Sequence, residues 1–598
     1  MLGKRLAFAR RLVLSLPALL LFAVCAWTQG GDISSPGTRN DPSLVPITPP
    51  PAESNPNSRV ASGVSADQER RIRFPVQTIL VQVPSVVTDK SGNHVHGLAK
   101  KDFHVFENGK ERKIATFEEI TATDKQLSVI ATKPGEFTNL MLADQQPRTL
   151  AVIALDTVNT PLPEQANGRR ELIKYLTENM NSDQVLALMI ITSQGVKVVE
   201  GLTADRQQLV RLLKGASGEQ NALLGLTPDA QVNASVGDIP AMPHDLNRPF
   251  AAAAAVVAHG DALNAQVKEE DAIEQTLNGF LEIAWYLSGI PGRKSLVWAT
   301  GGFPFAISSA AQLPPGVDHA ELYERTMQAL AAAQISVYPV DVRGLIGNYT
   351  SAAVVASNGP EMANHISNST QFQQSLIETF NQFADMTGGK AFYNTNDLAG
   401  SFKRATEDAT SYYLAGYYLD THNNRPGWRE LKVKVDRNDM EVRAREGFFV
   451  TNTTVNFDLT RSADVSFALT SPIEGTGVPL TVRWLGSSGE GTKKKTQFVI
   501  HMPPGAVSID STDGRKHVNF DFAAAAYVGN NKTGKTAVTT QQTFTTNVPD
   551  AQVASLLANG IDFKNALELG PGQYVVRVVI RDNVTGKVGS VTAPLTVN

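Results

Sequence analysis

The chain has 598 residues, too many for one hydrophobic core, so several domains are expected. Its hydrophobic fraction of 42%, charged fraction of 19% and net charge of -4 are those of an ordinary globular protein. Because no surplus of positive charge would attract the chain to nucleic acid, we expect no nucleic-acid partner.

The first segment, residues 1–29, is typical of a secretory signal peptide. Four basic residues precede the apolar run Leu12–Ala26, which is shorter than the ~20 residues that a membrane-spanning helix needs. We therefore expect export to the periplasm, the cell envelope or the extracellular space, with no stable membrane span after cleavage. The only cysteine, Cys25, lies in this run, so lipidation of Cys25 and a retained anchor are the alternatives.

Residues 30–75 are rich in Pro and Ser and predict a disordered linker, since they cannot bury enough apolar surface to fold. Two later segments, 76–120 and 411–450, show short alternating strands separated by turns such as Asn108-Gly109. Each segment lacks a core of its own. We expect them to pair into one β-sandwich from which the intervening domain is extruded.

Between them, residues 145–410 alternate strand and helix patterns, which predicts an α/β domain with a doubly wound, mostly parallel sheet covered on both faces. The interruption at about 218–265 shows little periodicity and reads as a partly helical insertion. Strands are expected at 149–155, 185–191, 196–199, 294–298, 335–340 and 390–393. Helices are expected around Leu172–Met180, after Thr203-Ala-Asp205, and at 270–288, 319–333, 371–386 and 397–409. The remaining residues, 455–598, predict an all-β unit with an immunoglobulin-like sandwich.

The apolar strand at 149–155 ends in Asp156-Thr-Val-Asn159-Thr160, which places a carboxylate, an amide and a hydroxyl at its carboxyl end. In open α/β sheets, ligands and metal ions bind at this edge, because strand ends and helix N-termini meet there. Asp156 is therefore the first candidate for a functional residue.

Several motifs in this order resemble the von Willebrand factor A-related exported proteins typical of Acidobacteria. They are Lys101-Asp-Phe-His-Val-Phe-Glu-Asn-Gly-Lys, Leu155-Asp-Thr-Val-Asn-Thr, Pro291-Gly-Arg-Lys-Ser-Leu-Val-Trp and Val337-Tyr-Pro-Val-Asp-Val-Arg-Gly. The resemblance covers about residues 76–450. It implies a von Willebrand A-like fold, which usually serves as a binding module with a metal-ion-dependent adhesion site.

In that superfamily the site uses Asp-x-Ser-x-Ser, a later Thr and a later Asp. Here the first motif is Asp156-x-Val158-x-Thr160, and the later Asp position falls at Thr300-Gly301-Gly302, which has no carboxylate. Because Mg²⁺ requires near-octahedral oxygen ligands, we expect no cofactor beyond a weakly bound Mg²⁺ or Ca²⁺. Asp156, Thr160 and Asp341 would form this degenerate site if Asp341 approaches Asp156 across the sheet edge.

The structural alternative is that Asp156 and Asn159 cap the following helix or order the loop through bonds to the backbone. The same strand end also partly resembles the nucleophile motif of haloacid dehalogenase-like phosphatases, but Val158 replaces its second acid. No nucleophile elbow, phosphate-binding loop or zinc-protease motif is present.

We therefore interpret the chain as a non-enzymatic binding module for a protein or cell-envelope partner. The partner-binding candidates are Asp156, Asn159, Thr160, Gly301 and Gly302. A metal-dependent, phosphatase-like hydrolase using Asp156 and a purely structural envelope protein are the alternatives.

Three further groups of residues are expected to have structural rather than functional roles. His94-x-His96, with His104 nearby, could chelate Zn²⁺ but sits at a turn without cysteines. The tyrosines at 412, 413, 417 and 418 are expected to fill a sandwich core and its rim. Lys493-Lys-Lys495 is expected to be a solvated loop.

Overall fold

The computed structural model describes residues 80–121, 133–140, 150–180, 184–215, 247–303, 319–345, 374–408, 410–419, 427–450, 457–489, 491–512, 515–529 and 535–598. All of them belong to one compact unit of the chain, Ser54–Asn598. The expected signal peptide, Cys25, the linker and residues 218–246 of the expected insertion lie outside the described residues.

Two antiparallel sheets form a sandwich from the segments before and after the α/β domain. Their orders are β13-β1-β11-β4 and β14-β12-β2-β3, so early and late strands alternate in the first sheet, and in the second the early strand β2 pairs with the late strand β12. The strands are β1 (Leu80–Asp89), β2 (Phe103–Glu107), β3 (Lys110–Arg112), β4 (Thr116–Thr121), β11 (Ser411–Tyr418), β12 (Gly427–Val435), β13 (Met440–Ala444) and β14 (Gly447–Val450). The core includes Val83, Val105, Tyr413 and Leu431, so neither segment fills it alone.

A five-stranded sheet lies at the centre of the α/β domain, with the order β10-β9-β6-β7-β8. Its strands are β6 (Leu150–Asp156), β7 (Leu186–Thr192), β8 (Gly195–Thr203), β9 (Lys294–Thr300) and β10 (Ile335–Asp341). Strands β10, β9, β6 and β7 are parallel to one another, and β8 is antiparallel to β7. This confirms the prediction of a mostly parallel sheet. The strand expected at 390–393 is reduced to one parallel bridge between Val340 and Phe392.

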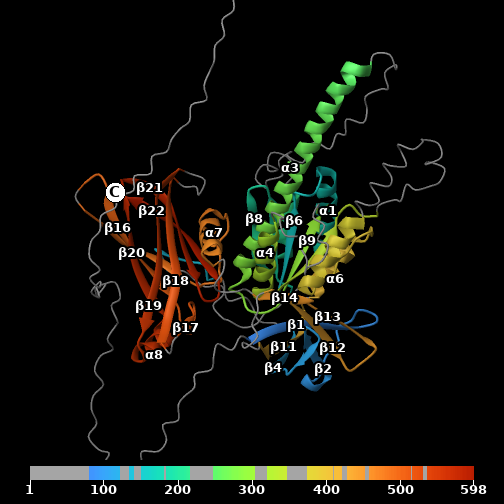
Figure 1. Ribbon diagram of the computed structural model, residues 1–598, viewed down its shortest axis with the longest axis horizontal. Coiled ribbons are helices and arrows are strands. Elements are labelled where there is room, and N and C mark those ends of the chain that lie inside the picture. The colour runs from blue at the N-terminus through green and yellow to red at the C-terminus, as the bar shows by residue number, and fades with distance from the viewer. Residues whose placement is uncertain are drawn as a thin grey trace, which may run out of the picture. The chain divides into compact units, whose positions relative to one another are not determined.

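Helices cover both faces of this sheet (Figure 1). They are α1 (Leu162–Lys174), continued by a π-helical turn η2 (Tyr175–Asn179), then α2 (Arg206–Gly215), α3 (Asn247–Leu287), α4 (Ala320–Ala332), a helix at 374–387, and α6 (Leu398–Glu407). Strand residues alternate between the two faces. Val152 and Ala154 pack with α3, α4 and the helix at 374–387, whereas Ala151 and Ile153 pack with α1, α2 and α6.

Helix α3 is much longer than the strands that it covers. The sequence predicts a helix at 270–288, but the helix begins at Asn247 and is continuous with the second half of the expected insertion. Of the residues from Val267 onward, whose exposure the structure describes, Val267–Asp271 are exposed and the first buried side chain is Ile273. At 1.5 Å per residue, the part before Ile273 is about 39 Å long, and Figure 1 shows it running past β6 and β9.

The C-terminal region contains two further sheets. One has the order β20-β16-β15-β5, and the other has the order β17-β18-β21-β22 with β19 paired to β18. The strands are β5 (Glu136–Thr138), β15 (Thr481–Ser488), β16 (Lys494–Met502), β17 (Ile509–Thr512), β18 (Arg515–Val528), β19 (Thr536–Val548), β20 (Ile561–Leu569), β21 (Gly572–Asp582) and β22 (Val588–Val597). Phe498, Phe520 and Phe563 lie in their shared core.

Two features of this region differ from the sequence prediction. It is not all β, because it contains helices α7 (Phe457–Thr470) and α8 (Asp550–Asn559). Val465 and Ala468 of α7 pack against Val579 of β21, so these two apolar residues, three apart, lie on one face of a helix. In addition, β5 comes from residues that were assigned to no domain, and it pairs with β15.

Candidate functional site

The predicted site lies where the strand order of the α/β sheet reverses. From β6 the chain continues to β7 on one side, and it later returns to β9 on the other side. Leu155 pairs with Ala299, so the next residues, Asp156 and Thr300, lie side by side at the carboxyl ends of these strands. Such a reversal is the usual ligand position in open α/β sheets.

The carboxylate of Asp156 is enclosed by donors from the chain itself. Oδ1 accepts from the backbone N–H groups of Val158 (2.9 Å) and Asn159 (3.0 Å). Oδ2 accepts from Asn159 Nδ2 (2.8 Å), Trp298 Nε1 (3.0 Å) and Thr300 Oγ1 (2.9 Å). Since a carboxylate offers about four lone-pair positions, these donors leave none for a ligand.

Burial dominates the electrostatics of this carboxylate, since Asp156 is only 2% exposed. Burial raises the pKa of Asp156, and the hydrogen bonds from Asn159, Thr300 and Trp298 oppose that rise. A metal ion would have to displace several of these donors. The geometry therefore supports a structural role for Asp156, in which it ties the loop after β6 to the end of β9.

The other predicted partner-binding residues lie around this carboxylate. Asn159 Nδ2 also donates to Thr276 Oγ1 of α3 (2.7 Å), and Thr160 Oγ1 accepts from the N–H of Gly301 (2.8 Å). A Cβ on Gly301 would lie 3.2 Å from the Asn159 oxygen, so glycine permits this close approach. Gly302 donates to Thr300 Oγ1 (3.2 Å). The structure thus brings all five residues together.

Asp341 does not join this group, contrary to the sequence expectation. Strand β9 lies between β6 and β10, so the two strand ends are about 10 Å apart at 4.8 Å per strand. Arg343 occupies both oxygens of Asp341, through Nε at 2.8 Å and Nη2 at 2.7 Å. Within the described ranges, no group of three or more His, Cys, Asp or Glu residues could hold a metal ion.

Trp298, Thr300 and Thr276 are neighbours of the candidate site that the sequence did not indicate. Thr300 was considered only as a position that lacks a carboxylate. The spacing of Trp298 and Thr300 was the available signal, because residues two apart in a strand share one face.

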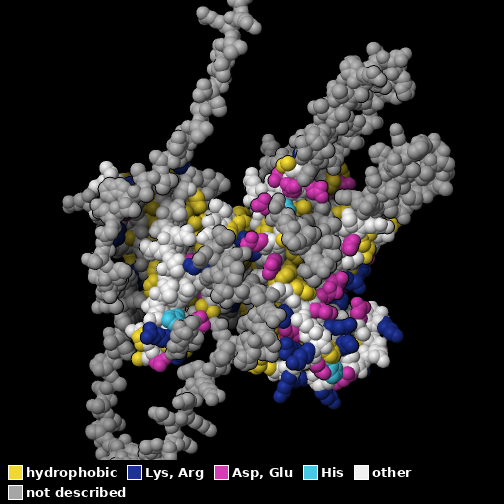
Figure 2. Space-filling view, viewed as in Figure 1, with side chains coloured by type: hydrophobic (Ala, Val, Ile, Leu, Met, Phe, Trp, Pro, Cys, Tyr) yellow, Lys and Arg dark blue, Asp and Glu magenta, His cyan; other side chains and the backbone are white. Residues whose placement is uncertain are grey.

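The remaining candidates have separate partners. His96 contacts Glu119 (2.8 Å), whereas His104 contacts Glu111 (2.7 Å) and Asp436 (3.0 Å), so no shared metal site forms. Tyr412, Tyr413 and Tyr417 are buried, as expected for core tyrosines, and Tyr418 is exposed. The loop expected at Lys493–Lys495 is wrong in part, because Lys494 and Lys495 begin β16. On the face shown in Figure 2, Lys and Arg side chains are interspersed with Asp and Glu over the sandwich.

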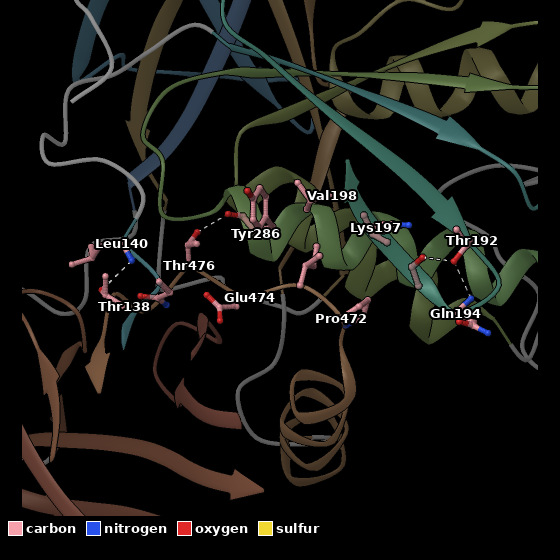
Figure 3. A pocket seen from close by; sticks show the side chains of 14 residues that line it. Thr138, Leu140, Thr192, Gln194, Lys197, Val198, Tyr286, Pro472, Glu474 and Thr476 are labelled. Atoms are coloured by element: carbon pink, nitrogen blue, oxygen red, sulfur yellow. Dashed lines mark hydrogen bonds between the residues drawn. The ribbon is translucent and has the colours of Figure 1, made fainter. Parts of the chain in front are cut away.

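A cleft of about 710 Å³ lies elsewhere, beside β8 (Figure 3). Its lining residues include Lys197, Tyr286 and Glu474 but none of the residues around Asp156. The concave surface and the predicted site are therefore separate features of the chain.

Comparison with known proteins identifies no relative. No family model matches the chain, and no curated protein matches it significantly. The resemblance to von Willebrand factor A-related proteins therefore stays a prediction. Among the helices of the described residues, none has the length and apolar character needed to cross a membrane.

Proposed function

We propose that the chain is an exported, non-enzymatic binding protein that recognises a protein or cell-envelope partner without a bound metal ion. In this proposal the α/β domain is von Willebrand A-like and the C-terminal strands form an immunoglobulin-like sandwich. The sheet order, which reverses between β6 and β9, supports the first assignment. The two packed antiparallel sheets support the second.

One observation supports binding without a metal ion: the carboxylate of Asp156 already accepts hydrogen bonds from five donor groups of the chain. The same saturation gives no support to a hydrolase, since a nucleophilic carboxylate needs a free oxygen directed at its substrate. The loop is therefore already ordered before any partner arrives.

The binding surface in this proposal is the strand-end face, defined as the residues that follow β6, β9 and β10. Leu162, which follows β6, is 38% exposed, and Leu345, which follows β10, is 58% exposed. Large exposed apolar side chains near a ligand edge are suited to contact with a partner. Helix α3 extends past the same edge, because its Thr276 is level with Asn159.

Affinity capture from an envelope extract of the source organism tests the proposal. We expect the immobilised chain to retain its partner equally with and without EDTA, and to lose it when Leu345→Asp is introduced. Leu557→Asp is the matched control, because Leu557 of α8 is 59% exposed and lies in another domain. Release of the partner by EDTA, or equal capture by both variants, would contradict the proposal.

A further inference from the structure

The cleft beside β8 lies along an open edge of the α/β sheet. Strand β8 is the last strand in its sheet, and its residues 195–198 form one wall of the cleft. The facing wall is formed by residues 138–140, 472–474 and 476. Figure 3 shows Lys197 and Val198 on the β8 wall and Thr138, Leu140 and Glu474 on the other side.

The register of the β7–β8 hairpin shows which backbone groups face away from β7. Antiparallel pairs alternate between those that exchange hydrogen bonds and those that do not. The N–H of Val196 donates to Glu282 Oε2 (2.6 Å) and therefore faces away from β7. The pair Ile191 and Val196 is thus one that does not exchange backbone hydrogen bonds. Val198 is two residues further along the same register, opposite Met189. Its N–H and C=O therefore also point outward, along the cleft. Because Glu282 already accepts from the N–H of Val196, the N–H of Val198 is the donor that an added strand would use.

Two polar side chains that line the cleft, those of Lys197 and Tyr286, are hydrogen-bond donors. Lys197 is partly exposed, and no carboxylate of the described residues pairs with its ammonium group. Burial, Glu474 and Glu200 raise the pKa of the Tyr286 hydroxyl to about 12, which keeps it protonated as a donor. Glu474 Oε1 already accepts from the N–H of Thr592 (2.7 Å). A ligand with a negative charge and a hydrogen-bond acceptor would complement Lys197 and Tyr286.

We propose that this cleft binds a short, extended polypeptide segment as an added strand on β8, with an acidic side chain of the segment against Lys197. Strand addition satisfies the outward backbone groups of an edge strand, and pockets for alternate side chains add specificity. The cleft volume of about 710 Å³ lies within the range of ligand sites. This proposal deepens the binding function proposed above but uses no residue of the strand-end face, so either proposal can fail alone.

The test is selection of a phage-displayed library of random heptapeptides on the full chain. Enriched peptides should carry Asp or Glu among β-branched residues. A synthetic copy should bind at least tenfold more weakly to Lys197→Met than to the wild type. Lys495→Met is the control, because Lys495 is exposed and lies outside the cleft.

A second arm leaves the protein unchanged. Two N-methylated forms of the selected peptide are compared, one methylated at the odd-numbered amides and one at the even-numbered amides. One form should lose binding and the other should keep it, because only every second N–H group of an added strand faces β8. Failure to enrich any peptide would overturn the proposal. The proposal would also be overturned if the peptide bound Lys197→Met as tightly as the wild type and both N-methylated forms bound equally well.

Discussion

The indole Nε1 of Trp298 donates to Asp156 Oδ2 at 3.0 Å, which ties β9 to the carboxyl end of β6, the middle strand of the α/β sheet. Trp298 is fully buried and meets Phe280 edge-on at a centroid distance of 5.0 Å. One side chain thus joins the apolar core beneath α3 to the polar strand end.

Trp298→Phe tests this link. The change removes one of the three donors to Oδ2 of a buried carboxylate and leaves a small void, and we expect a cost of about 1–3 kcal/mol. We expect a lower free energy of unfolding in urea. Trp484→Phe is the control, because the Trp484 indole bonds to the Pro594 carbonyl at the surface (3.1 Å). Equal losses in the two variants would contradict the assigned role.

Arg443→Met tests the ion pair between the sandwich and the α/β domain. Arg443 Nη2 contacts Asp408 Oδ1 at 2.8 Å, and their side chains are 16% and 10% exposed. Removing one partner of such a buried pair costs about 3–5 kcal/mol. In Arg404→Met, which breaks an exposed pair with Asp397, we expect about 1 kcal/mol or less. Urea unfolding of both variants provides the comparison.

Lys294→Met tests a buried amine that has no acidic partner among the described residues. Burial lowers the pKa of Lys294 to about 7, while Nζ donates to the Ala333 carbonyl (2.6 Å). The unfolded state therefore takes up a proton near pH 10.5, before the folded state does, and stability falls as the pH drops from about 10.5 to about 7. We expect Lys294→Met to be more stable than the wild type at pH 7. Unfolding measured across this pH range should show a weaker pH dependence, and an unchanged slope would refute the prediction.

Gly389→Ala tests a close approach of the chain to β10. A Cβ on Gly389 would lie 1.9 Å from the Val337 carbonyl oxygen, which is part of the backbone and cannot turn aside. We expect a loss of more than about 2 kcal/mol in the free energy of unfolding. Gly201→Ala is the matched control, since its nearest neighbour would be the Tyr286 hydroxyl at 3.9 Å. A thermal shift near zero for both variants would show that the backbone at Gly389 can move.

The positions of the buried strands could be predicted from the sequence, whereas the contacts between distant residues could not. Residues 149–155 form a continuous apolar run because β6 is covered on both faces, and this pattern belongs to parallel strands. The sequence also predicted helix starts after Asp205 and at Asp397, and each of these aspartates accepts from a backbone N–H three residues on (2.9 Å). These features depend on local spacing, which a sequence displays directly.

The state of Asp156 could not be predicted in the same way. Two of its donors, Trp298 and Thr300, lie 142 and 144 residues further along the chain. Only the parallel pairing of β6 with β9 brings them to the carboxylate. Strand β5 was missed for a related reason: its three residues carry too short a pattern to be recognised without β15.

The sandwich has a consequence for the newly synthesised chain. The N–H of Leu98 bonds to the hydroxyl of Tyr413, 315 residues later, and β1 has neighbours only among late strands. On a ribosome, β1–β4 therefore emerge long before β11–β14 exist to pair with them. A chain stopped near residue 410 would leave these strand edges bare and open to pairing with other chains, which makes the nascent protein a substrate for chaperones.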